Sequence, residues 1–219
     1  MGNYIYKYLV YNSVLLKFME EDRTLKYLRT VNEDEVSKSE LKKFTESTEI
    51  WAKFAHNKNI YYPVAVYENG APKCYISMGS EIIEVHFLDE RMFQYIIMSY
   101  DKYDADFELY PDNKIFLSEI LVRKFNYQEK EMLHDLNSDK VMIFTPEGKL
   151  TVRTSKVFRE PSVRFQEEEF ESKELVNVSH NWLPMPTFGD YGYLCDYDKI
   201  LKQGDLLSKA ITDDDNLKE

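Results

Sequence analysis

The spacing of apolar residues changes along the chain, from a helical period before residue 60 to short alternating runs after it. Over residues 36–56 the apolar positions approximate one stripe of an amphipathic helix, and the acidic stretch Asn32–Glu35 precedes them. The stripe consists of Val36, Leu41, Phe44, Ile50, Trp51 and Phe54. Mixed charges fill the other positions, as on a solvated helix face. The pattern therefore predicts a helix at about residues 36–56, with His56 at its end.

Residues 4–30 allow two interpretations. Alternating apolar residues between positions 4 and 10 favour a strand, whereas those between positions 9 and 19 also fit helical spacing. A hairpin that turns at Glu20–Arg23 and pairs residues 14–19 with 24–28 competes with two short helices. The apolar runs are too short to decide between them, so both interpretations stay open.

Between residues 60 and 158 the chain consists of short runs rich in Tyr, Val, Ile and Phe, separated by turn residues at fairly regular intervals. Asn69–Gly70 tolerates the positive φ angles of a tight hairpin. Thr145–Gly148 has Pro and Gly at positions suited to a turn. We expect an antiparallel, meander-like sheet, interrupted by one short helix at about residues 128–136.

After residue 159 the regular pattern thins, and Glu160–Pro161 marks a break. The aromatic, turn-rich stretch 182–193 predicts an ordered loop, and the acidic residues 213–219 predict a frayed tail. We expect residues 159–219 to form an irregular C-terminal arm or small subdomain. The predicted whole is one α+β domain over residues 1–219, whose helical or mixed N-terminal segment 1–58 packs on one face of the sheet 60–158.

The charge balance narrows the class of partner. The chain has 219 residues with 28 Lys and Arg against 39 Asp and Glu, a formal net charge of -11 and a pI near 5.0. This balance argues against direct binding to nucleic acid through phosphates and favours a protein partner with a basic surface.

The sequence also bears on compartment and cofactors. No stretch approaches the roughly 18 consecutive apolar residues that span a bilayer, and the N-terminus lacks the order of a secretory signal. The two cysteines, Cys74 and Cys195, lie far apart and suit a reducing compartment. With 7 glycines, the chain contains neither Gly-x-Gly-x-x-Gly nor a phosphate-binding Gly-Lys-Ser/Thr loop. We therefore expect a cytoplasmic protein without membrane contact and without a cofactor.

One candidate metal site lies in the stretch Ser80–His86. On a strand, Glu84 and His86 project from the same face and could offer one oxygen and one nitrogen to a divalent ion. Two ligands do not make a site, so a polar outer face of a half-buried strand is the preferred interpretation. The alternative function that uses this pair is metal-dependent hydrolysis.

Cys195 offers a second candidate chemistry. Together with His180 and one of Asp190, Asp196 or Asp198, it supplies the residue types of a thiol nucleophile, its base and an orienting acid. The adjacent Asp196 opposes formation of the thiolate. A buried cysteine that packs as a small apolar residue is therefore the preferred interpretation.

Two segments combine acidic and aromatic residues and favour protein binding. Aromatic rings supply contact area at low entropic cost, and carboxylates select Arg and Lys. The first segment contributes Tyr100, Asp101, Tyr103, Asp104, Asp106, Phe107 and Glu108, and the second contributes Glu167, Glu168, Glu169 and Glu171. Each segment could also be an ordinary solvated connection.

These observations favour a cytoplasmic, non-enzymatic protein that binds a basic partner. Its most concrete form is an immunity protein or antitoxin that masks the cationic active site of a toxin, possibly a nuclease. The alternatives are the metal-dependent hydrolase at Glu84 and His86, and a phage or scaffold component. No protein family is recognised in any part of the sequence.

Overall fold

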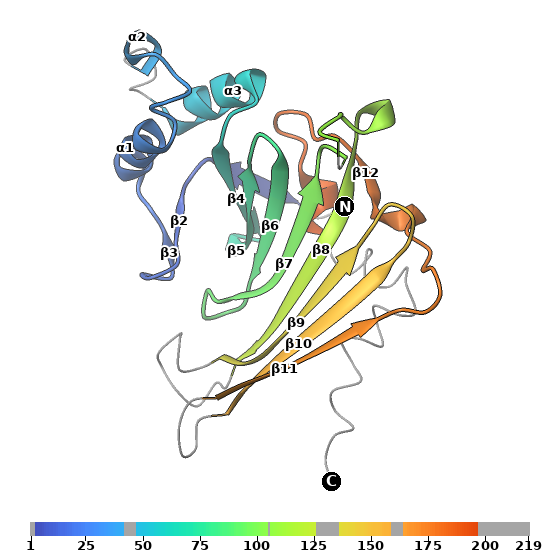
Figure 1. The fold of residues 1–219 in the computed structure, drawn as a ribbon. Helices are drawn as coiled ribbons and strands as arrows, with labels where there is room; N and C mark the ends of the chain where they lie inside the picture. The colour runs from blue at the N-terminus through green and yellow to red at the C-terminus, as the bar shows by residue number, and fades with distance from the viewer. Residues whose placement is uncertain (1–2, 42–46, 105, 126–135, 159–163, 197–219) are drawn as a thin grey trace.

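A computed structural model describes residues 3–41, 47–104, 106–125, 136–158 and 164–196. Its centre is a ten-stranded antiparallel sheet in which most neighbours in space are neighbours in sequence (Figure 1). From one edge to the other the path runs through β1 (Tyr4–Lys7), β4 (Tyr62–Glu68), β5 (Ala71–Met78), β6 (Ile82–Leu88), β7 (Gln94–Asp101), β8 (Lys114–Phe125), β9 (Leu136–Phe144), β10 (Leu150–Phe158) and β11 (Arg164–Glu171). The predicted α+β fold with a meander-like sheet is confirmed.

The residues predicted to form turns have the positive φ angles that such turns require. Asn69 and Gly70 join β4 to β5 with φ angles of 53° and 84°. In the turn between β9 and β10, the Gly148 amide donates to the Thr145 carbonyl at 2.9 Å, with φ 92° at Gly148. A Cβ at Gly148 would lie 2.5 Å from the Val176 carbonyl oxygen, so only glycine fits there without displacement.

Three helices lie together near β4 (Figure 1). They are α1 (Glu21–Val31), α2 (Lys38–Leu41) and α3 (Thr48–Lys58). The helix α1 excludes the hairpin considered for residues 14–28, because it buries Leu25 and Leu28 on one face and begins with two acidic residues. A separate two-stranded ribbon, β2 (Tyr11–Asn12) with β3 (Lys17–Phe18), precedes it.

The single helix predicted over residues 36–56 is wrong, because the chain forms two helices there. Ser47 is extended, with φ -155° and ψ 135°, and its side chain accepts a hydrogen bond from the Glu49 amide as the N-cap of α3. Trp51 and Ala55 are buried with Val64 of β4 in the main core, whereas Ile50 is exposed. Residues 42–46 lie outside the described part of the chain.

The C-terminal segment is more regular than expected. The second acidic segment, Glu167–Glu171, lies in β11, which extends the sheet beyond β10. The strand β12 (Trp182–Pro184) pairs with β8. The predicted ordered loop ends in a short 3-10 helix, η3 (Gly192–Cys195), whose neighbour Tyr191 is buried and packs edge-on against Tyr6 at 5.3 Å. The helix predicted at 128–136, apart from Leu136, and the tail at 213–219 lie outside the described residues.

Candidate functional site

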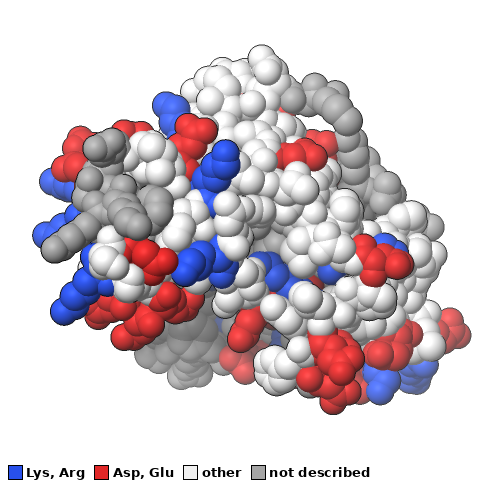
Figure 2. All heavy atoms as spheres, turned by 90° about the horizontal axis from the view of Figure 1, so that it is seen from above, with Lys and Arg blue, Asp and Glu red and all other residues white. Residues whose placement is uncertain are grey.

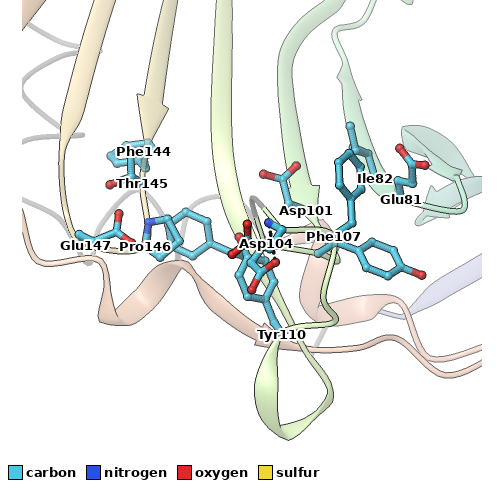
Figure 3. Close-up of a pocket in the computed structure, with 13 residues that line it drawn as sticks. Glu81, Ile82, Asp101, Asp104, Phe107, Tyr110, Phe144, Thr145, Pro146 and Glu147 are labelled. Carbon is cyan, nitrogen blue, oxygen red and sulfur yellow. Dashed lines mark hydrogen bonds between the residues drawn. The ribbon is translucent and has the colours of Figure 1, made fainter.

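A pocket of about 630 Å³ lies at the end of the sheet where β6 begins, β7 ends and β9 turns into β10. Figure 3 shows Phe144–Glu147 on one side and Ile82 with Phe107 on the other, with Asp101, Asp104 and Tyr110 between them. Its lining comprises Glu81, Ile82, Asp101, Tyr103, Asp104, Asp106, Phe107, Tyr110, Phe116, Phe144, Thr145, Pro146 and Glu147. We call it the acidic pocket, since five of these residues are acidic and five are aromatic. None of the described lining residues is Lys or Arg.

The loop between β7 and β8 forms one wall of the acidic pocket. Tyr103 and Leu109 form an isolated β-bridge, and the Asp104 amide donates to the Glu108 carbonyl at 2.9 Å. The Asp104 Oδ1 atom accepts hydrogen bonds from the amides of Asp106 and Glu108, each at 2.9 Å. This carboxylate therefore holds the loop in a tight turn. Phe107 stands at the tip with φ 61° and 75% of its surface exposed.

The floor of the acidic pocket consists of packed aromatic rings. Phe116 on β8 is fully buried, and its ring centroid lies 4.7 Å from that of Trp182 on β12. Tyr110 meets the same Trp182 ring edge-on at 4.9 Å. The pairing of β12 with β8 places Trp182 opposite Phe116, so the C-terminal segment fixes the orientation of both rings.

Three carboxylates act electrostatically on the Tyr110 phenol. Burial raises the pKa of this phenol, and Asp101, Asp104 and Glu147 raise it further. Burial also raises the pKa of Asp101, against a hydrogen bond from Ser118 that lowers it. Seen from above, several red groups lie among white atoms at the lower right with a few blue atoms beside them, whereas red and blue mix closely on the side of the helices (Figure 2). A cation entering the acidic pocket would relieve these unfavourable interactions.

The residues predicted for the first acidic segment occupy three different positions: the pocket lining, the exposed surface beside it and the core. Five line the acidic pocket: Asp101, Tyr103, Asp104, Asp106 and Phe107. Glu108 is exposed beside the pocket. Tyr100 is corrected, because none of its surface is exposed and its hydroxyl lies 3.7 Å from the Met98 sulfur in the core. It therefore cannot touch a partner.

The second predicted segment lies on β11, in a different hollow of about 460 Å³. Glu167, Glu168 and Glu169 line it together with Arg153 of β10, and Glu171 is exposed at the end of the strand. The Arg153 Nε atom pairs with the Glu169 Oε2 atom at 2.6 Å. The two acidic segments thus belong to separate surfaces, and the second carries its own counter-ion.

Sequence reasoning missed several residues of the acidic pocket, including Glu81, Glu147 and Phe144. A signal for them existed in the predicted meander. In an antiparallel meander, alternate turns lie at the same end of the sheet. The turns β5–β6, β7–β8 and β9–β10 therefore meet, and each contributes carboxylates to one hollow.

Glu84 and His86 share a face of β6, as predicted, but their side chains interact with each other. The His86 Nε2 and Glu84 Oε2 atoms lie 3.5 Å apart, and hydrogen bonding to His86 lowers the pKa of Glu84. The His86 ring stacks on Tyr75 at 4.2 Å with an interplanar angle of 6°. Within the described ranges no group of three or more His, Cys, Asp or Glu residues is placed to hold a metal ion.

Cys195 is fully buried, in agreement with the preferred interpretation. Its sulfur lies 3.7 Å from the Cys74 sulfur and 3.3 Å from the Tyr191 carbonyl oxygen. Asp196 accepts a hydrogen bond from the Tyr4 hydroxyl at 2.6 Å, and His180 is exposed on the short helix η2 (Ser179–Asn181). The thiol constellation is therefore not assembled by the residues described, and Asp198 lies outside them.

None of the helices in the described part of the chain combines the length and the apolar composition needed to cross a membrane. Comparison of the chain with protein-family models, with curated proteins and with solved structures finds no match.

Proposed function

We propose that this chain is a protein-binding protein whose acidic pocket receives a cationic side chain from a partner with a basic surface. The observation that carries the proposal is the joint lining of one hollow by five carboxylates and five aromatic side chains, with no Lys or Arg among the lining residues described. Carboxylates form charge-assisted hydrogen bonds with guanidinium and ammonium groups. Aromatic faces attract the same cations.

The architecture of the acidic pocket suits binding more than turnover. Phe107 offers an exposed ring at the rim, while Phe116 and Trp182 fix the floor. A rigid aromatic floor lowers the conformational entropy lost on association. The net charge of -11 supports the same role, because an acidic protein attracts a basic partner over long range and speeds their encounter.

The most concrete form of this proposal is an immunity protein or antitoxin in the cytoplasm. Toxins that act on nucleic acid carry positive clefts, and an acidic protein with a cation-binding pocket complements such a cleft. The support for this form is chemical complementarity between the acidic pocket and a basic active site.

A peptide pair tests the proposal without knowledge of the partner. An arginine-rich peptide is titrated into the protein beside an identical peptide in which citrulline replaces arginine, with binding followed by calorimetry at two salt concentrations. We expect the arginine peptide to bind at least about tenfold more tightly, and its advantage to shrink as salt rises. Equal affinities for the two peptides would contradict cation recognition.

The site of binding is checked on the same peptides with Phe107→Ala. This ring is 75% exposed, so its removal should leave the thermal melt unchanged. We expect faster dissociation of the arginine peptide, because an aromatic anchor at the rim contributes mainly to the lifetime of a complex. Unchanged dissociation would place the peptide elsewhere on the protein.

A further inference from the structure

A second hollow, of about 440 Å³, lies beside the acidic pocket and shares Tyr103 with it. Its walls come from the end of α3, from β4, from the turn between β5 and β6, and from the segment that follows β12. Lys102 lines it, whereas the preceding residue Asp101 lines the acidic pocket. Adjacent residues at the end of β7 thus supply opposite charges to two adjoining hollows. We call the second hollow the lysine pocket.

The Lys102 ammonium group is held in place by neutral acceptors. Lys102 has only 5% of its surface exposed. Its Nζ atom donates to the Gly79 carbonyl at 2.6 Å and to the Asn59 Oδ1 atom at 2.9 Å. Both acceptor residues also line the lysine pocket, so the ammonium group lies at its wall. No carboxylate pairs with Lys102 in the part of the chain that the structure describes.

This arrangement leaves a charge that the protein does not balance. Burial lowers the pKa of Lys102 to about 8, and no neighbouring acid opposes that shift. An ammonium group has three N–H donors, and two of them are accounted for by Gly79 and Asn59. A buried cation is stabilised most by an anion that it can both pair with and donate to.

The neighbouring histidine does not compete for that anion. The His56 Nδ1 atom lies 2.8 Å from the Tyr62 hydroxyl, which in turn lies 3.3 Å from the Tyr191 hydroxyl. Burial lowers the pKa of His56, and the positive charge of Lys102 lowers it further. His56 is therefore neutral near pH 7, and Lys102 alone carries positive charge among the described residues of the lysine pocket.

The rest of the lining sets the class of ligand. Ile60, Met78, Leu109 and Met185 give the lysine pocket an apolar lining in addition to its one cation. Its volume lies within the range of roughly 300–1,000 Å³ typical of small-molecule sites. One cation suits a monoanion, and the apolar wall suits a hydrocarbon body. We propose that the lysine pocket binds a small organic acid, with its carboxylate on Lys102 and its hydrocarbon part against these apolar side chains.

Calorimetry with hexanoate and hexanamide tests this proposal on the intact chain. The two probes have the same hydrocarbon tail and differ in the charge of the head group. We expect hexanoate to bind with millimolar affinity and hexanamide about tenfold more weakly, because only the acid compensates the buried cation. Equal binding of the two probes, or tighter binding of inorganic phosphate than of hexanoate, would overturn the proposal.

The pH dependence of hexanoate binding provides an independent readout in the unmodified protein. Lys102 is charged below its pKa and loses its proton above it, so affinity should be constant near pH 7 and fall about tenfold per pH unit above about pH 8. Burial lowers the pKa of His56 and raises that of Tyr62, so both titrate outside this window. Tyr103→Phe controls for the remaining phenol. Unchanged affinity between about pH 7 and about pH 10 would overturn the proposal.

A pair of lysine variants locates the site. Lys102→Met should abolish discrimination between hexanoate and hexanamide, whereas Lys114→Met should preserve it. Lys114 is a suitable control because it is half exposed and pairs with Asp112 at 3.2 Å. Thermal melts show whether Lys102→Met folds, and if it does not, the pH series on the unmodified protein decides. Retained discrimination in folded Lys102→Met would overturn the assignment.

Discussion

The acidic pocket and the acidic strand β11 carry similar numbers of carboxylates in very different surroundings. In the acidic pocket, three turns bring carboxylates together around aromatic rings, and Phe116 and Trp182 form a packed floor. On β11, residues 166–171 are all exposed, and Arg153 pairs with Glu169. Acidic sequence therefore does not by itself define a site. Both regions are hollowed, but only the first has aromatic walls, and none of its described lining residues is Lys or Arg.

The largest expected difference between the two regions is in stability. Phe116→Ala should lower the free energy of unfolding by about 3–5 kcal/mol, because it leaves a cavity under the acidic pocket. Phe170→Ala on β11 should cost less than about 0.5 kcal/mol, since that ring is 60% exposed. Urea denaturation of the two variants measures this difference. Similar losses would show that β11 is as tightly integrated into the core as the pocket floor.

A glycine pair tests how rigidly the turn beside Glu147 is held. Gly148→Ala should cost about 2 kcal/mol or more, because φ is 92° and the new Cβ would lie 2.5 Å from the Val176 carbonyl oxygen. Gly70→Ala has a similar φ of 84° but open space around it, so its cost should be about 1 kcal/mol. Chemical denaturation compares the two variants. Equal costs would mean that the turn shifts freely.

The pH dependence of cation binding should reveal Asp101. Burial raises the pKa of this carboxyl group, so its negative charge is present above that pKa and is lost as pH falls through it. Arginine-peptide affinity should therefore begin to fall at a higher pH than an ordinary aspartate would cause, by up to about tenfold. Ser118→Ala should move this fall to higher pH still, because Ser118 stabilises the ionised form. Calorimetry from neutral to acidic pH measures it, and identical profiles in the unmodified protein and Asp101→Asn would contradict the assignment.

The smallest expected effect concerns the counter-ion on β11. Arg153 and Glu169 are both more than half exposed, so solvent screens their ion pair. Arg153→Met should change the free energy of unfolding by less than about 0.5 kcal/mol. The same change should strengthen binding of the arginine peptide slightly, because it leaves Glu169 without its partner. A loss above about 1 kcal/mol in denaturation would show instead that this pair anchors the edge of the sheet.

The sequence predicts the fold best where local chemistry and global pattern agree. Asn69–Gly70 and Thr145–Gly148 adopt the turns expected of them, because Asn and Gly adopt the required positive φ angles at lower cost than most residues. The prediction of one helix over residues 36–56 fails at Ser47, whose extended backbone and N-cap hydrogen bond begin a new helix. An N-cap residue within a periodic stretch can therefore end one helix and begin another even where the apolar period continues.

The site was predictable only in part. Tyr100 was predicted to bind a partner as part of an acidic and aromatic segment, but β7 extends to Asp101, so Tyr100 follows the strand alternation into the core. The strand β11 escaped detection because Gln166–Glu169 lacks apolar alternation and both of its faces meet solvent. The carboxylates of Glu81 and Glu147 join the acidic pocket only through the meander topology, which brings distant turns together.

The most direct test of the acidic pocket compares two charge-matched triple variants. Glu81→Gln, Asp106→Asn and Glu147→Gln remove three pocket charges but keep Asp104, which holds the loop. Glu167→Gln, Glu168→Gln and Glu171→Gln remove three charges from β11. Association of the arginine peptide is followed by surface plasmon resonance at two salt concentrations. We predict that the pocket variant associates at least about tenfold more slowly and loses most of its salt dependence, while the β11 variant changes much less. Equal slowing in both variants would contradict the account, because it would mean that net charge alone attracts the cation.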